Sequence, residues 1–380
     1  MTTAVESRPP LRRHPRLAVR WVLPALIGSL AACTSAPPPK PTGPPAGTVA
    51  REASRWVPVD WHDLPGWKSD RPLDAWPALL QSCQRPASAW TLLCTEVQRN
   101  PPDSDAELRD WLARNVQPYR VESHDGAASG LITGYFEPLV EARRVRSGAW
   151  RSAVYSPPPD LATRKPYWTR RELDTLPAAQ ASLRGREIAW LADPLDVLVL
   201  HIQGSGRLRI TEPDGRVRTV RVAYAGTNGH PYRSVGRWLI EQGELQPGQA
   251  SWPAIRDWAR RNPARLDEML WANPRYVFFR EEPLPDPSVG PRGAQGVPLT
   301  PGRSIAVDPK SVPYGTPVWI DTTEPLSGTP LRRLVLAQDT GSAITGPIRA
   351  DFFWGWDGDA AEQAGRMRQP LRMWVLWPRR

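Results

Sequence analysis

The chain is poor in the residues that many catalytic mechanisms require. Its 380 residues include only five histidines and three cysteines. These form no His-x-His, His-Glu-x-x-His or paired Cys-x-x-Cys pattern, so we expect no metal site. The sequence also lacks a Gly-x-Ser-x-Gly turn, a Gly-Lys-Ser/Thr phosphate loop and a complete dinucleotide-binding glycine pattern, so we expect no cofactor. By elimination, the credible catalytic groups are carboxylates.

A concentrated basic tract is absent as well. The formal net charge is +10, but the positive charges are spread along the chain without a run of five or six basic residues. Proteins that bind nucleic acid usually gather their charge in one tract or on one face. We therefore expect no nucleic-acid partner.

Proline and tryptophan, in contrast, are abundant. The 45 prolines are more than double the ordinary usage of about 5 %, and proline is poorly tolerated inside helices, so a long helical bundle is excluded. The 19 tryptophans outnumber the eight tyrosines and five phenylalanines together. This predicts a large buried core, a flat stacking surface, or both. A hydrophobic content of 40 % and a charged content of 23 % are typical of a folded protein.

The N-terminus has the pattern of an export signal. After Arg20, an apolar run of about twelve residues ends at Cys33; it is too short to span a bilayer. Leu30-Ala31-Ala32-Cys33 matches the bacterial lipobox, whose cysteine is acylated, so we predict a signal peptide over 1–32 and a lipidated, Pro-rich tether over 33–50. A plain signal peptide with an incidental cysteine is the alternative. Thr34 follows the cysteine in place of Asp, which is typical of sorting to the outer membrane.

The remaining residues, about 330, are enough for roughly two domains. Periodicity and capping signals predict helices over 104–116 and 234–242, and two helices within 255–272 that meet at Asn262-Pro263. Strand-like runs are 197–200, 220–224, 276–279, 318–320, 334–337 and 371–376. Cys83 and Cys94 would form a disulfide in an oxidising compartment; two separate buried thiols are the alternative.

Three aspartates lie in the densest motif region. Asp339 ends an apolar strand and enters a Gly-rich loop, and its apolar neighbours would desolvate the carboxyl and raise its pKa, as a general acid requires. Asp351 is followed by Phe352, Phe353 and Trp354, which form either a sugar-stacking platform or part of the core. Asp308 precedes a proline and is best explained by a role in a turn.

At these motifs the chain resembles the membrane-bound lytic murein transglycosylase A family. The resemblance covers about residues 100–378, and the segment 304–376 resembles that family's three-aspartate domain. Further matching motifs are 134–138, 202–206, 224–234 and 277–279. The loop after the catalytic aspartate departs from the family pattern, because Ser342 and Thr345 stand where glycine and lysine are usual.

The resemblance implies a mainly β fold. A double-psi β-barrel would be formed by 51–134 together with 274–380, and a smaller β-rich domain, 135–273, would be inserted between them. A few helices would accompany these domains, and a groove for glycan strands would lie between them.

The resemblance also implies an activity and a location. The enzyme would cleave the β-1,4 bond between N-acetylmuramic acid and N-acetylglucosamine of peptidoglycan without hydrolysis, leaving 1,6-anhydromuramic acid ends, at the periplasmic face of the outer membrane. Asp339 corresponds to the single catalytic acid that later acts as base. Asp308 would be a supporting residue. The candidate substrate-binding residues are Tyr135, Gln203, Ser205, Thr227, Asn228, Asp351 and Trp354.

Two other interpretations belong to different functional classes. One is a non-catalytic module that binds or loosens the cell wall. The other is a true hydrolase in which Asp339 and either Asp351 or Asp308 activate a water molecule.

Overall fold

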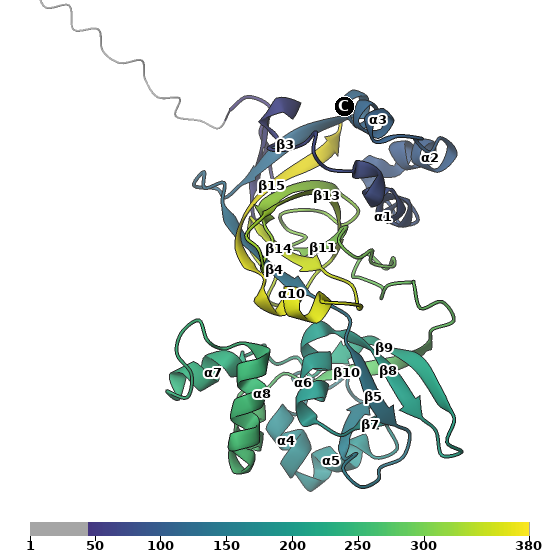
Figure 1. The fold of residues 1–380 in the computed structure, drawn as a ribbon, viewed down its shortest axis with the longest axis vertical. Helices are drawn as coiled ribbons and strands as arrows, with labels where there is room; N and C mark the ends of the chain where they lie inside the picture. The colour runs from purple at the N-terminus through teal and green to yellow at the C-terminus, as the bar shows by residue number, and fades with distance from the viewer. Residues whose placement is uncertain (1–44, 380) are drawn as a thin grey trace, which may run out of the picture. The chain divides into compact units, whose positions relative to one another are not determined.

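The computed structural model describes residues 45–379 (Figure 1). The predictions for the signal peptide and for Cys33 lie outside the described residues. Within the described range, no helix combines the length and the apolar character needed to cross a bilayer.

A nine-stranded sheet dominates the structure, in the order β1-β2-β3-β15-β12-β13-β11-β14-β4. Strand β4 also pairs with β15, so the strands from β15 to β4 curl into a nearly closed barrel. The strands are β1 Val49–Ala50, β2 Arg55–Pro58, β3 Val116–Glu122, β4 Gly130–Tyr135, β11 Ser304–Val307, β12 Pro317–Thr323, β13 Pro330–Asp339, β14 Arg349–Phe353 and β15 Arg368–Pro378.

Alternation of side chains explains how this sheet builds its core. Along β14, Ala350 and Phe352 are fully buried inside the barrel, whereas Arg349 and Asp351, which alternate with them, are only partly buried. Neighbouring side chains of a strand point to opposite faces, so each strand supplies both the core and the outer surface. The interior contacts are completed by Ile132, Ile305, Val307, Val318, Ile320, Val335, Leu371, Met373 and Val375.

Three short helices cover one side of the barrel: α1 Trp76–Ser82, α2 Thr91–Arg99 and α3 Asp105–Asn115 (Figure 1). They pack on outward-facing residues such as Trp319, Leu334 and Leu336. Cys83 and Cys94 form a disulfide that joins the end of α1 to α2. Of the two states that the sequence allowed for these cysteines, the structure therefore selects the bridge.

A second sheet has six strands in the order β10-β9-β8-β5-β7-β6. Its strands are β5 Leu139–Arg143, β6 Ser152–Tyr155, β7 Glu187–Leu191, β8 Ser205–Thr211, β9 Val217–Thr227 and β10 Val277–Pro283. The helices around it are α4 Arg170–Thr175, α5 Pro177–Leu183, α6 Pro194–Gln203, α7 Val235–Glu241, α8 Trp252–Arg261 and α9 Leu266–Trp271. One further helix, α10 Ala360–Arg366, packs on β4 of the barrel.

The mainly β architecture is confirmed, with 30 % of the residues in strands and 28 % in helices. The helical share is larger than the few helices we expected. The helices are short, and in α1, α5, α6 and α8 a proline occupies the first turn. Proline is tolerated there because the N–H that it lacks has no partner in the helix. A high proline content therefore excludes long helices but not short ones.

One predicted strand is wrong. The run 197–200 lies in helix α6, and its side chains are buried on every side. A continuous apolar run cannot distinguish a buried helix from a buried strand. The local signals do distinguish them: Asp193 caps the N-terminus, Pro194 follows, and Gly204 ends the helix with φ +79°. The predicted helices over 104–116, 234–242 and 255–272 are confirmed, as are the other five strand-like runs.

Strand β10 lies in the second sheet, although its residues fall within the range 274–380 predicted for the barrel. The predicted return to the barrel at 274 precedes β10, but β10 pairs with β9 in the second sheet along its whole length. The chain therefore returns to the barrel only after Pro283. Because the apolar run at the start of β10 is like those of the barrel strands, only its pairing partner reveals its sheet.

Candidate active site

The register of the barrel strands places five residues in one row. From β13 to β15, neighbouring strands pair Asp339 with Ala306, Ala306 with Asp351, Asp351 with Thr133, and Thr133 with Arg368. Paired residues in adjacent strands have their side chains on the same face. The two carboxylates therefore lie on the outer face of the barrel, separated by strand β11.

A register shift aims Asp339 at this face. Simple alternation would direct Asp339 to the same side as Ala337, which is inside the barrel. The pairing of β11 with β13 instead skips Gln338, so that Ala306 pairs with Asp339. Such bulges re-aim side chains and are frequent beside active sites.

The carboxyl group of Asp339 is held by two donors. The hydroxyl of Tyr135 donates to Oδ2 at 3.1 Å, and the backbone N–H of Ala294 donates to Oδ1 at 2.9 Å. Burial nevertheless dominates and raises the Asp339 pKa from 3.8 to about 6, although these hydrogen bonds and one from the Thr340 backbone lower it. The raised pKa predicted from the sequence is thus confirmed in direction, and a protonated Asp339 is accessible near neutral pH.

The segment that carries the Ala294 donor is fixed by close packing. A Cβ atom on Gly293 would lie 2.5 Å from the backbone oxygen of Gln338 and 3.1 Å from Cβ of Asp339, so only glycine allows this approach. Gln295 donates its backbone N–H to the same Gln338 oxygen, at 3.0 Å. Its side-chain amide donates to the backbone oxygens of Ser82 and Arg85 beside α1.

Asp351 forms a second acidic centre. Thr133 donates its hydroxyl to Oδ1 of Asp351 at 2.6 Å, and Arg349 donates to the Thr133 oxygen at 2.9 Å. Burial raises the Asp351 pKa to about 6, the hydrogen bond from Thr133 and the charge of Arg349 lower it, and the nearby charge of Asp339 raises it further. A negative charge on Asp339 therefore disfavours the ionised form of Asp351.

Gln203 connects the inserted domain to this site. It is the last residue of α6, and its side-chain oxygen accepts the backbone N–H of Phe136, next to Tyr135, at 3.1 Å. Ser205 begins β8 two residues later and is partly buried. Gln203 therefore lies beside the end of β4, the strand that carries Tyr135, and Ser205 follows it in the chain.

Thr227 and Asn228 lie at the far end of β9. The Thr227 hydroxyl accepts the backbone N–H of Gly229 at 3.1 Å. Asn228 is 1 % exposed and bonds two other backbone segments, one at Trp168 and one at Pro274 and Tyr276. Its amide is therefore occupied within the protein, whereas Thr227 remains partly exposed.

Trp354 and Asp308 have mainly internal contacts. The Trp354 ring is partly buried and lies 4.9 Å from that of Phe352, with its indole N–H directed to the sulfur of Met367. Its role in substrate binding stays a prediction. Asp308 is 7 % exposed and accepts the backbone N–H groups of Lys310 and Gly346.

Sequence reasoning missed a buried ionic cluster at Glu137. This side chain is fully buried and is bonded by Arg207 at 2.8 Å and by Arg221 at 2.6 Å. The same guanidinium groups donate to the backbone oxygens of Pro287 and Val289 in the segment that returns to the barrel. The signal in the sequence was the glutamate in an otherwise apolar motif, but its partners are 70 and 84 residues away.

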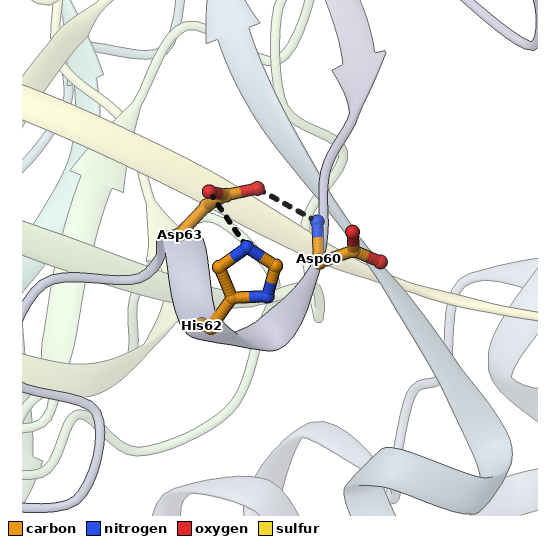
Figure 2. Close-up of side chains that lie close together, drawn as sticks. All are labelled: Asp60, His62 and Asp63. Atoms are coloured by element: carbon orange, nitrogen blue, oxygen red, sulfur yellow. Dashed lines mark hydrogen bonds and ion pairs between the residues drawn. The ribbon is translucent and has the colours of Figure 1, made fainter.

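The sequence patterns also missed one group of potential metal ligands. In residues 45–379, only Asp60, His62 and Asp63 bring three such side chains together, and all three are exposed (Figure 2). The Asp63 carboxylate accepts the backbone N–H of Asp60 at 3.0 Å and lies 3.5 Å from the His62 ring. These contacts close one turn of helix, which accounts for the cluster without a metal ion.

The hydrogen bond from Tyr135 makes a testable contribution to the Asp339 pKa. A Tyr135→Phe variant keeps the ring beside Phe353 but loses the hydroxyl that stabilises the charged carboxylate. We expect the Asp339 pKa to rise above about 6, by up to about one unit. Titration of the carboxyl carbon by NMR measures it. Tyr314→Phe is the matched control, since Tyr314 lies nearby but interacts with Thr340; an unchanged or lower pKa in Tyr135→Phe would contradict the assignment.

Two family models match the chain. The MltA specific insert domain matches residues 131–280, and the 3D domain matches residues 303–377. The first range ends inside β10, in agreement with the pairing of β10 in the second sheet. The second contains all three aspartates of the motif region.

Known proteins agree with both models. Membrane-bound lytic murein transglycosylase A of Escherichia coli (strain K12) is 31 % identical over 277 residues, which are 71 % of this chain and 72 % of that protein. The crystal structure of MltA from Neisseria gonorrhoeae is 30 % identical, with a TM-score of 0.74, and covers 88 % of this chain and 96 % of its own. The structure of lytic transglycosylase LtgG of Burkholderia pseudomallei is 44 % identical, with a TM-score of 0.59. The match covers 88 % of this chain and 100 % of that one.

These relatives are enzymes, so the interpretation as a non-catalytic wall module is not supported. The residues that the two family models match, 131–280 and 303–377, include every member of the row that contains Asp339. The chain belongs to the membrane-bound lytic murein transglycosylase A family, and it is a peptidoglycan-cleaving lyase.

Proposed function

We propose that the enzyme cleaves the β-1,4 bond between N-acetylmuramic acid and N-acetylglucosamine without water, and that Asp339 is both the acid and the base. One observation carries this proposal. Asp339 has a pKa of about 6, and its two oxygens are each held by a separate donor. A group of this kind is protonated often enough to act as an acid and is supported as a carboxylate after it has donated.

The reaction then needs two proton transfers at one side chain. Asp339 first gives its proton to the glycosidic oxygen, and the bond from C1 to that oxygen breaks. The resulting carboxylate is stabilised by the Ala294 N–H and the Tyr135 hydroxyl. It takes the proton of the C6 hydroxyl of the muramic acid while that oxygen bonds to C1. The protons balance, Asp339 is regenerated, and no water is consumed.

The substrate-binding residues are part of the same proposal. Asp351, with Thr133, would contact sugar hydroxyls beside Asp339, because it lies two strands away in the row. Gln203, Ser205 and Thr227 would contribute from the inserted domain, and the partly buried Trp354 would contribute its ring. Tyr135 would serve mainly to hold Asp339. Asn228 would act indirectly, since its amide is occupied within the protein.

The hydrolytic alternative uses the same residues differently. Asp351 has a pKa of about 6, so it could act as the ionised partner that activates a water molecule while Asp339 donates a proton. The two mechanisms give different products. Anhydro ends support the proposal, whereas reducing ends, heavier by one water molecule, support the hydrolase.

Asp339→Asn tests the catalytic assignment. Asparagine keeps the shape and one accepting oxygen but cannot donate or take up the proton, so both steps fail. We expect the rate at which anhydro-muropeptides are released from purified sacculi to fall by at least about 10²–10⁴-fold. This is the rate enhancement that a single general acid or base usually provides. Mass spectrometry of the products measures it.

Two controls accompany this variant. Asp351→Asn should lower the rate less, and murein binding by Asp339→Asn should persist, which separates lost chemistry from lost folding. Near wild-type release of anhydro ends by Asp339→Asn would remove Asp339 from the catalytic role.

The dependence of rate on pH provides an independent test. The reaction begins with protonated Asp339, whose pKa is about 6. We expect kcat/KM to be constant below this pKa and to fall about ten-fold for each pH unit above it. The hydrolytic alternative also needs an ionised carboxylate, which adds an ascending limb and makes the profile bell-shaped. The profile is measured on sacculi, with product mass followed in parallel.

The location is part of the proposal too. The relatives are named membrane-bound, and the lipobox ending at Cys33 would supply an anchor in the outer membrane. We expect Cys33→Ala to abolish labelling by radioactive palmitate and to release the protein from the membrane fraction. A Cys83→Ala/Cys94→Ala variant, which keeps the lipobox, should retain both. Continued labelling of Cys33→Ala would refute the anchor.

A further inference from the structure

A large cleft is lined by residues that do not include Asp339. Its volume is about 2160 Å³, larger than the roughly 300–1,000 Å³ of an ordinary small-molecule site. One wall is formed by the start of α6, by α7 and by α8 with the loop before it. The other wall is formed by α10, the first residue of β15, and Pro325. The cleft therefore has the inserted domain on one side and the barrel on the other.

Both walls carry exposed arginines. Arg237 and Arg260 lie on the first wall, and Arg366 and Arg368 lie on the second; these four define the arginine cleft. Acidic side chains line it as well. Glu241 is 3.8 Å from Arg237, and Glu362 is 3.3 Å from Arg366.

The ion pairs of these arginines are weak. Arg237, Arg260 and Arg366 pair only with residues three or four positions away on their own helices, at 3.3–3.8 Å, and such exposed pairs contribute a few tenths of a kcal/mol. Arg368 has no ion pair within residues 45–379. By contrast, Arg256 on the same wall is held at 2.6 Å by both Asp193 and Asp196. The four cleft arginines can therefore exchange their partners for a ligand.

The arginine cleft is connected to the catalytic row. Arg368 is the last member of the row that begins at Asp339, four strand spacings away. With about 4.8 Å between strands, this is roughly 19 Å along the barrel surface. Arg368 is therefore the residue that the row and the lining of the arginine cleft share.

We infer that the arginine cleft binds the carboxylate groups of peptide stems on the glycan strand. This inference rests on the proposed function. The stems of peptidoglycan end in free carboxylates, and guanidinium groups on two facing walls match such groups because they bind carboxylates through two parallel hydrogen bonds. The enzyme would therefore prefer strands that still carry their peptides.

Binding to two matched substrates tests this inference. The probes are murein glycan strands with intact tetrapeptide stems and the same strands after an amidase has removed the stems. Affinity is measured in the Asp339→Asn background, so that the strands stay intact. We expect the stem-bearing strands to bind more tightly, and this preference to weaken at high salt, because exposed charges are screened.

Two double variants address the two walls. Arg237→Gln/Arg260→Gln and Arg366→Gln/Arg368→Gln should each reduce the preference for stem-bearing strands roughly five-fold. Arg209→Gln/Arg216→Gln is the matched control. It also removes two exposed arginines that are paired with acids, but from β8 and the turn after it, outside the cleft.

Three outcomes would overturn the inference. Equal affinity for both kinds of strand is the first. An unchanged preference in both cleft variants is the second, and an acidic partner protein in the cleft would give this result. An equal loss of affinity for both strands is the third, because the arginines would then bind the glycan itself. The proposed function fails separately, through the product masses described above.

Discussion

The arrangement of the two domains depends on the buried carboxylate of Glu137. It lies where the chain leaves the barrel, two residues after Tyr135, and it is bonded by Arg207 and Arg221 from adjacent strands of the insert. Their donation to the returning segment fixes the second crossing at the same point. Arg207 also lies 4.0 Å from the ring of Trp356 in the barrel. Removing one member of a buried pair typically costs 3–5 kcal/mol, because the remaining charge loses its partner. This single cluster therefore sets the spacing between Tyr135, on which Asp339 relies, and the insert that faces it.

The raised pKa of Asp339 makes the stability of the folded state depend on pH. Its pKa is raised from 3.8 to about 6, which corresponds to about 3 kcal/mol in favour of the protonated form. Because the folded state holds this proton more tightly than the unfolded state, the contribution to folding is full below the unfolded pKa and is lost as pH rises toward 6. Asp351 adds a second effect of the same sign. Gln295 and Gln338 both donate their side-chain amides to backbone oxygens of α1, and these bonds hold the segment of the Ala294 donor in place whatever the charge of the carboxyl.

Features that depend on residues close together in the chain could be predicted from the sequence, whereas contacts between distant segments could not. The Asp339 carboxyl at the end of an apolar strand, the cap of α3 at Ser104 and most barrel strands followed from short-range patterns. The second donor to Asp339 is the backbone N–H of Ala294, 45 residues away. A backbone N–H is present at almost every residue, so nothing in the sequence indicated which one would bind the carboxylate. The helix α6 was missed because burial on all sides erases periodicity. The extent of the insert depended on which sheet β10 joins, which is a choice between distant partners of similar hydrophobicity.

The core and the active site are specified by the same alternation. Burying Ala350 and Phe352 leaves Asp351 on the outer face, and burying Ile132 does the same for Thr133. A slip of one residue would exchange these faces and place carboxylates in the barrel interior, so hydrophobic packing selects the register that assembles the row. Asp339 is the exception that required a bulge, because Ala337 before it must stay inside and Gln338 must reach α1. The irregularity at the end of β13 thus allows a strand whose other side chains build the core to place its last side chain on the outer face, beside Ala306.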